Sequence, residues 1–289
     1  MGNQPMSDER RREGAKGTRP FFIVSSGRSG TAMLHKALSA VPGVTMHHEY
    51  AVQITQPLAV KRYLGAVDDA GTRQVLEESF GAAIAHAQGT HWGDSSNKLS
   101  WLVPDLGKLF PEARFLHLVR DGRKVASSYF HKLGAETYDD RSNAVLQAWY
   151  DGKGSLPPPE KPYWWPVPRR GDPLAGRFRH FDQFQRICWH WAEINRVALE
   201  ALAALPRHRT LFVKLEDLTR SPSVLKDLYD FLGLPAAAAD FALFARPHNV
   251  NKPEDRLLDA RQTAAFEAIA GAMMARLGYA GTPEYAVNY

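Results

Sequence analysis

Short strand-like runs alternate with helix-like segments along this chain, and this alternation limits the available folds more than any other feature. Most of the runs are rich in β-branched or aromatic residues, and each is only long enough for one strand. The runs cover residues 21–25, 44–46, 90–94, 114–119 and 210–214. Strands separated by helices pair in parallel, because each connection must cross a face of the sheet. The sequence therefore predicts an α/β fold, with a parallel sheet flanked by helices on both faces.

The predicted helices fill the segments between these runs. Asp121 is placed to cap one of them, and Pro111 follows the end of another. We expect helices over residues 31–40, 73–88, 101–110, 123–133, 181–205, 222–232 and 260–277. No internal repeat or clear linker divides the chain, so we expect a single domain over residues 20–289, preceded by a disordered basic tail over residues 1–19.

Residues 151–180 interrupt the alternation and form a predicted irregular insertion or flap. Seven prolines lie between positions 157 and 173 of this insertion, and proline opposes both helix and sheet. The insertion also carries Tyr163, Trp164 and Trp165, which are unfavourable in water and are expected to pack on another surface.

Composition excludes several classes of protein. The net charge is +5, with 36 basic and 31 acidic residues, and this near balance argues against nucleic-acid binding. Cys188 is the only cysteine, so an internal disulfide is excluded and a reducing compartment is favoured; we expect a cytoplasmic protein. No apolar stretch approaches the roughly 18 residues of a membrane span, and the N-terminus lacks the apolar core of a signal peptide.

The segment Ser25-Ser26-Gly27-Arg28-Ser29-Gly30-Thr31 lies between a predicted buried strand and an amphipathic helix. Such a turn directs free backbone N–H groups and the positive end of the helix dipole at one point, which suits a phosphate or sulfate. The glycines allow close approach of an anion, and Ser29 and Thr31 add hydroxyl groups. Since no lysine follows Gly30, the segment is not the Walker motif of nucleotide triphosphatases, and it also lacks the dinucleotide fingerprint.

A second motif follows the clearest strand, where residues 115–123 read Phe-Leu-His-Leu-Val-Arg-Asp-Gly-Arg. Arg120 leaves the carboxyl end of that strand and offers a two-pronged phosphate contact. Ser128 lies two turns into the next helix and can face the same point. Together these residues suit a second phosphate group.

These two motifs resemble those of sulfotransferases that use 3′-phosphoadenosine 5′-phosphosulfate (PAPS). Arg28-Ser29-Gly30-Thr31 matches the R-S-G-T loop of the bacterial, glycan and tyrosylprotein branches, and Arg120 with Ser128 matches the 3′-phosphate motif. Further matches extend the resemblance over residues 20–235. The resemblance implies that the predicted parallel sheet is P-loop-like. The resemblance implies that adenosine 3′,5′-bisphosphate is the product and that no metal is required. The implied cofactor-binding residues are Ser26, Gly27, Arg28, Ser29, Gly30, Thr31, Ala32, Arg120 and Ser128.

The same resemblance assigns candidate catalytic roles. Arg28 is expected to stabilise charge rather than donate a proton, because its guanidinium is always charged. Lys98 is expected to supplement it, although a solvent-facing position at a helix start also fits. Glu49 is the preferred general base, and His48 is its rival. The adjacent His47, His48 and Glu49 do not form a convincing metal site.

Three functions stay open. The leading one is transfer of a sulfuryl group from PAPS to a hydroxyl of a small molecule, glycan, lipid or tyrosine; the others are a P-loop-type kinase and a non-catalytic nucleotide-binding or nucleic-acid-binding protein.

The insertion is expected to act as a mobile flap over the acceptor, with Arg169, Arg170 and Arg177 near its anionic groups. The alternative is packing on the outer surface or against a second subunit. Residues 246–252 are polar and basic enough to reach the nucleotide. The acceptor and the oligomeric state, a homo-oligomer included, are left open.

Overall fold

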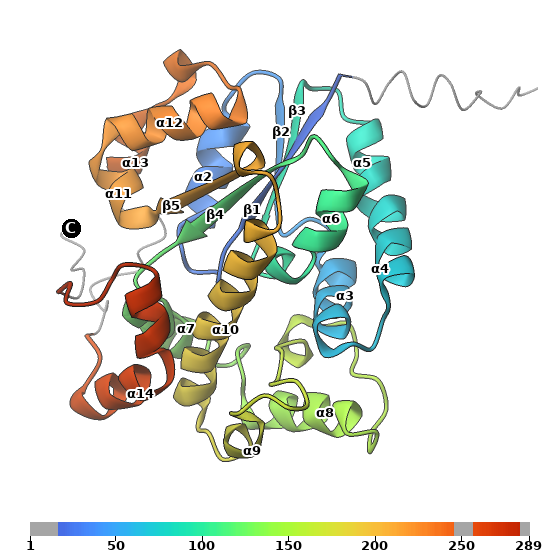
Figure 1. The fold of residues 1–289 in the computed structure, drawn as a ribbon, viewed down its shortest axis with the longest axis vertical. Helices are drawn as coiled ribbons and strands as arrows, with labels where there is room; N and C mark the ends of the chain where they lie inside the picture. The colour runs from blue at the N-terminus through green and yellow to red at the C-terminus, as the bar shows by residue number, and fades with distance from the viewer. Residues whose placement is uncertain (1–16, 246–256, 284–289) are drawn as a thin grey trace, which may run out of the picture.

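The computed structural model describes residues 17–245 and 257–283. Its centre is a five-stranded sheet with the order β2-β3-β1-β4-β5, and every neighbouring pair is parallel (Figure 1). The strands are β1 Arg19–Val24, β2 Val44–His48, β3 His91–Ser96, β4 Arg114–Val119 and β5 Thr210–Lys214. The predicted α/β fold is therefore confirmed.

The strand order places a switch point beside β1. From β1 the chain runs to β2 at one edge of the sheet, whereas from β4 it runs to β5 at the opposite edge. Ligands of open α/β sheets bind at the carboxyl ends of the strands next to such a switch. The loops after β1 and β4 are therefore the first place to look for a site.

Both faces of the sheet are buried, as expected for a parallel sheet. Phe21 and Ile23 of β1 contribute to one core, and Phe22 and Val24 to the other, because successive side chains of a strand point to opposite faces. The first core is closed by α2 Thr31–Ser39, α11 Leu215–Arg220, α12 Pro222–Leu232 and α13 Phe241–Ala245. The second is closed by α3 Val52–Leu64, α4 Asp69–Leu76, α5 Ala82–Ala85, α6 Val103–Leu109, α7 Gly122–Lys132, α10 Gln183–Ala203 and α14 Ala260–Arg276.

Several helices differ from the expectation. The predicted helix over residues 73–88 is α4, a π-turn η1 (Glu77–Gly81) and the short α5. Helices α3, α8 (Asp140–Tyr150) and α11 were not predicted. Helix α3 contains Pro57 and is buried over most of its length, so it lacks the one-sided apolar pattern that identifies a surface helix.

The two ends of the predicted domain are only partly described. The strand β1 begins at Arg19, so the predicted tail over residues 1–19 is too long at its carboxyl end. Residues 1–16 of that tail lie outside the described residues, as does the basic segment 246–252. No helix in the described part of the chain is long and apolar enough to cross a membrane.

The insertion is largely irregular, with only the 3₁₀ turn η3 (Lys161–Tyr163) and the short α9 (Ala175–Phe178) between residues 151 and 180. Trp164 and Trp165 are 1% and 3% exposed and belong to the larger core. The expectation that these side chains pack on another surface is confirmed, and that surface is the interior of the same chain.

Candidate active site

The loop of residues 25–31, called the phosphate loop below, follows the central strand. Gly27, Arg28 and Gly30 have positive φ values of 77°, 54° and 90°, which turn the backbone sharply before α2 begins. Gly30 is the N-cap of the nine-residue helix α2 and supplies no side-chain cap. The first N–H groups of a helix have no partner inside the helix, so this end of α2 suits an anion.

Gly27 is required by a close contact as well as by its φ. A Cβ atom at Gly27 would lie 1.9 Å from the hydroxyl oxygen of Tyr129 on α7. That hydroxyl donates to the carbonyl of Ser26 at 2.8 Å and accepts from Nδ2 of Asn97 at 3.3 Å. The buried Tyr129 therefore supports the phosphate loop from inside the fold.

The serines of the loop bond mainly within it. The hydroxyl of Ser29 donates to the carbonyl of Gly27 at 2.9 Å, and the oxygens of Ser26 and Ser29 are 3.1 Å apart. Both side chains are buried. Because the proton of Ser29 is used inside the loop in this conformation, Ser29 stiffens the loop rather than presenting a free hydroxyl donor. Thr31 is also buried, at the start of α2, and Ala32 follows it.

The structure brings together the residues of the two predicted phosphate motifs. Nε of Arg28 donates to the hydroxyl of Ser128 at 2.9 Å, and the Arg120 guanidinium donates to the carbonyl of Arg28 at 3.0 Å. Nε of Arg120 is buried and has no hydrogen-bond partner among the described residues. Two guanidinium groups and a hydroxyl thus converge at the carboxyl ends of β1 and β4.

Glu216 braces the turn that carries Arg120, a role that sequence analysis missed. One carboxylate oxygen of Glu216 accepts from the backbone N–H of Asp121 at 2.9 Å, and the other accepts from the hydroxyl of Tyr279 at 2.8 Å. Asp121 itself caps α7, as predicted, by accepting from the backbone N–H of Arg123 at 2.9 Å.

Glu49 and His48 lie at the carboxyl end of β2. Glu49 has a positive φ of 59°, and its carboxylate is 3.2 Å from Nζ of Lys161 in the insertion. His48 is exposed, and its Nδ1 lies 3.1 Å from the carbonyl oxygen and 3.0 Å from the hydroxyl oxygen of Ser95. The carboxylate is therefore held between the sheet and the insertion, whereas the imidazole is tied to the edge of the sheet.

Asp94 on β3 is a second carboxyl group near Glu49, and sequence analysis gave it no role. Asp94 is fully buried, and one of its oxygens accepts from the backbone N–H of Tyr50 at 3.0 Å. Burial, together with the nearby charge of Glu49, raises the pKa of Asp94 to about 7. The hydrogen bond fixes the turn that follows Glu49.

Lys98 is buried, which overturns the solvent-facing alternative. It is 1% exposed, and its Nζ has no hydrogen-bond partner in the described residues. Nζ lies 3.8 Å from the ring centre of Trp165 and 5.4 Å from that of Trp101. Burial lowers the pKa of Lys98 well below its usual value, although the charge of Glu49 opposes this shift. An ammonium in such surroundings is poised to pair with an anion that enters the site.

The described residues contain no group of three or more His, Cys, Asp or Glu side chains arranged to hold a metal ion.

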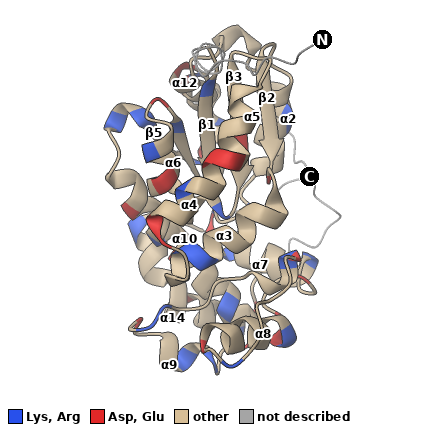
Figure 2. Cartoon of the chain, turned by 90° about the vertical axis from the view of Figure 1, so that its right-hand side faces the viewer, with Lys and Arg blue, Asp and Glu red and all other residues tan. Residues whose placement is uncertain are grey.

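The side of the molecule shown in Figure 2 carries acidic and basic residues interspersed over its helices.

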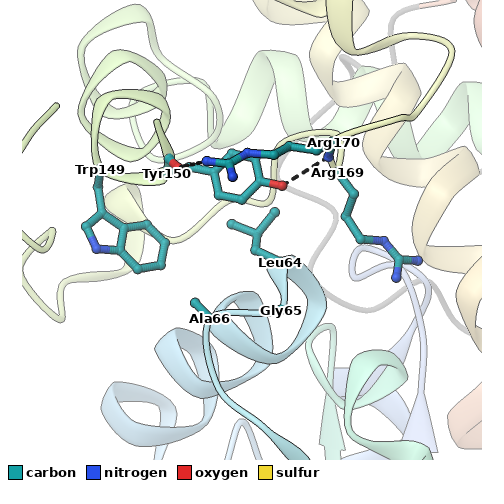
Figure 3. A pocket seen from close by; sticks show the side chains of 7 residues that line it. All are labelled: Leu64, Gly65, Ala66, Trp149, Tyr150, Arg169 and Arg170. Carbon is teal, nitrogen blue, oxygen red and sulfur yellow. Dashed lines mark hydrogen bonds between the residues drawn. The ribbon is translucent and has the colours of Figure 1, made fainter. Parts of the chain in front are cut away.

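A pocket of about 480 Å³ lies away from the candidate active-site residues described above (Figure 3). It lies at the far end of α3 from Glu49, and a helix of 13 residues is about 20 Å long. Arg170 folds back over Tyr150 and donates to its carbonyl at 3.1 Å, whereas the side chain of Arg169 extends in another direction. The pocket is lined by Leu64, Gly65, Ala66, Trp149, Tyr150, Arg169 and Arg170.

The segment from β1 through α8 contains the phosphate loop, Glu49, Lys98, Arg120 and Ser128, and it matches a known family. Residues 20–154 match the model of the sulfotransferase family. These residues belong to the sulfotransferase family. A search of curated protein sequences finds no match to the chain.

Solved sulfotransferases share the fold. The sulfotransferase from Alicyclobacillus acidocaldarius is 18% identical, with 90% of this chain and 94% of that chain covered and a TM-score of 0.52. Sulfotransferase STF9 from Mycobacterium avium is 12% identical, with 90% of this chain and 77% of that chain covered and a TM-score of 0.50. The sulfotransferase family and fold imply a transferase of sulfuryl groups.

Proposed function

We propose that the protein transfers a sulfuryl group from PAPS to a hydroxyl group of an acceptor. The products are the sulfate ester, adenosine 3′,5′-bisphosphate and one proton. The observation that carries this proposal is the convergence of Arg28, Arg120 and Ser128 at the carboxyl ends of β1 and β4. The acceptor class is a small molecule, glycan, lipid or tyrosine.

The residues present fit the two anionic ends of PAPS. The uncapped start of α2 and the loop of Ser26, Gly27, Arg28, Ser29, Gly30, Thr31 and Ala32 suit the 5′-phosphosulfate. Arg120 suits the 3′-phosphate, because its buried Nε has no hydrogen-bond partner in the described part of the chain. Ser128 lies close to Arg120, because Arg28 bonds to both residues. When bound, the donor supplies an activated sulfur and a stable leaving group.

Arg28 and Lys98 are the proposed charge-stabilising residues. Sulfuryl transfer resembles phosphoryl transfer, in which charge spreads over the transferring oxygens and positioning supplies most of the catalysis. Arg28 remains charged throughout and is held by Ser128. Lys98 has no carboxylate or carbonyl to neutralise it within hydrogen-bond distance in the described residues.

Glu49 is the proposed general base, which removes the proton of the acceptor hydroxyl. Its carboxylate is partly buried beside Lys161 and is electrostatically coupled to Lys98, so it faces the cationic part of the site. His48 remains the rival base, but its Nδ1 is already engaged by Ser95 and its ring is exposed.

The decisive experiment measures transfer of labelled sulfate from PAPS to a panel of phenols, sugars, lipids, tyrosine peptides and secondary metabolites by mass spectrometry. Glu49→Gln should lower turnover by roughly 10²-fold or more while leaving the affinity for adenosine 3′,5′-bisphosphate within about twofold. His48→Ala should be milder. An inactive His48→Ala protein beside an active Glu49→Gln protein would reverse the assignment of the base. Absence of transfer to every acceptor, together with no binding of adenosine 3′,5′-bisphosphate, would refute the proposed function.

A further inference from the structure

Two adjacent tryptophans of the insertion have different neighbours. The ring of Trp165 lies 3.8 Å from Nζ of Lys98 and 5.2 Å from the ring of His190. The ring of Trp164 instead lies 5.6 Å from Trp149 on α8 and 5.5 Å from Nζ of Lys61 on α3. Both side chains are buried, but only Trp165 reaches the candidate active site.

Lys98 is carried to this place by the sheet. Ser96 at the end of β3 is paired with Val24 at the end of β1, so Lys98 leaves the sheet beside the start of the phosphate loop. Asn97 bonds to Tyr129, which in turn bonds to Ser26. The lysine therefore lies next to the site for the anion, while its Nζ contacts aromatic carbon.

His190 on α10 forms another part of the same surroundings. It is fully buried, and neither ring nitrogen has a hydrogen bond of good geometry among the described residues, although a polar contact with the Ser26 main chain acts to raise its pKa. Its ring stands at 82° to that of Trp165. Burial, aided by the charge of Lys98, lowers the pKa of His190 well below its usual value, which favours the neutral imidazole. A neutral imidazole keeps a lone pair that can accept from an ammonium.

We propose that Trp165 and His190 are positioning residues that hold the ammonium of Lys98 toward the anion bound at the phosphate loop. The face of Trp165 attracts the cation where no carboxylate contacts it, and the ring of His190 packs edge-on against the same indole. The insertion is thereby a part of the charge-stabilising machinery. This inference rests on the proposed role of Lys98 in sulfuryl transfer.

The test compares Trp165→Leu with Trp164→Leu, a matched control in the same insertion. Lysine labelled with ¹³C at Cε reports the titration of Lys98 by NMR, and a Lys98→Met spectrum identifies its signal. Glu49, Lys161 and His190 are the charged or titratable groups that act on Lys98, and all three are unchanged in both variants. We expect Lys98 to titrate at lower pH in Trp165→Leu, because the attraction of the indole face is lost, and to be unchanged in Trp164→Leu.

Turnover with the best acceptor of the panel gives a second readout. Trp165→Leu and His190→Leu should each lower kcat at least tenfold, with the affinity for adenosine 3′,5′-bisphosphate within about twofold; Trp165→Phe should recover most of the rate. Trp164→Leu should lower thermal stability but leave kcat within about threefold. Trp165→Met replaces Trp165→Leu if the latter does not fold, since methionine fills irregular space without an aromatic face.

Equal titration of Lys98 in the two tryptophan variants, or equal losses of kcat, would overturn the inference. The NMR result needs no acceptor. If the wild-type protein transfers no sulfate and binds no adenosine 3′,5′-bisphosphate, while the titration of Lys98 shifts only in Trp165→Leu, the proposed function is refuted and the positioning of Lys98 stands.

Discussion

The phosphate loop and the insertion meet at the same end of the sheet, but they are built in opposite ways. In the loop, polar groups of neighbouring residues satisfy one another, as Ser29 does with Gly27. In the insertion, aromatic side chains pack against elements distant in the chain, as Trp165 does against Lys98 and His190. The loop therefore combines bonds within itself with support from Tyr129, Arg120 and Ser128, whereas the packing of the insertion depends on distant elements.

Lys98 lies where these two regions meet, and each region gives it a different kind of neighbour. The loop side of the site offers backbone N–H groups and guanidinium groups, which suit an anion. The insertion side offers aromatic carbon, which excludes water and strengthens electrostatic interactions. A buried lysine between the two costs stability in the absence of an anion and gains a partner when the anion binds. Substitutions on the two sides of Lys98 should therefore separate the two contributions.

Replacing Lys98 tests the largest effect. Lys98→Met should lower turnover by roughly 10²–10³-fold, the scale for loss of a preorganised charge-stabilising group. It should also raise stability at pH 7. Burial places the pKa of folded Lys98 below its unfolded value, so the unfolded state binds the proton more tightly. Lys98 therefore destabilises the fold until the pH rises above both pKa values. Sulfate transfer and urea unfolding check the two effects, and a destabilised Lys98→Met protein would contradict the burial argument.

Removing Arg120 tests the loop side alone. Arg120→Ala should weaken adenosine 3′,5′-bisphosphate roughly 10–100-fold, since a charge-assisted hydrogen bond contributes about 1.5–3 kcal/mol. Binding of AMP, which lacks the 3′-phosphate, should change little. Calorimetry with both nucleotides measures the difference, and Arg170→Ala is a control outside the site. Equal loss for the two nucleotides would remove Arg120 from the 3′-phosphate site.

Asp94 gives a prediction for pH. Its pKa of about 7 in the folded protein lies above the ordinary 3.8, so the folded state holds a proton that the unfolded state has released. Stability should therefore fall as the pH rises from about 4 to 7, and the contribution of Asp94 between pH 5 and 7 is about 2 kcal/mol. Asp94→Asn should remove this dependence. Urea unfolding at both pH values provides the measurement, and an unchanged slope would show that Asp94 is ionised in the fold.

Glu216 should produce the smallest effect. Glu216→Gln keeps one oxygen to accept from the N–H of Asp121, but its amide nitrogen can only donate to the hydroxyl of Tyr279, so the charge-assisted character of both bonds is lost and one of them must reverse direction. We expect a loss of about 1 kcal/mol in stability and a few-fold weaker binding of adenosine 3′,5′-bisphosphate. Tyr279→Phe serves as the comparison, because it removes one of the two bonds and spares the turn beside Arg120. Weaker nucleotide binding in Tyr279→Phe than in Glu216→Gln would contradict a brace that acts through Asp121.

The amino-acid sequence alone predicts the parallel sheet, the loop after its central strand and the approach of Arg120 and Ser128 to Arg28. These features follow from short-range patterns: a strand-like run, a glycine-rich turn, a helix cap and residues spaced along one strand and its helix. Because the carboxyl ends of parallel strands lie at the same edge of a sheet, local motifs are enough to bring the residues of the two phosphate-binding motifs together.

The surroundings of the reacting groups, by contrast, are defined only in the folded protein. Burial of Lys98 needs Trp165 from the insertion, the pKa of Asp94 depends on its burial within the completed sheet, and the support of Arg120 needs Glu216 from the far side of the chain. Helix α3 was also not predicted, because it buries Thr55 and Gln56 and exposes Ile54, so its apolar residues do not mark a single face. Burial and electrostatic environment depend on residues distant in sequence, and no local pattern encodes which of them will meet.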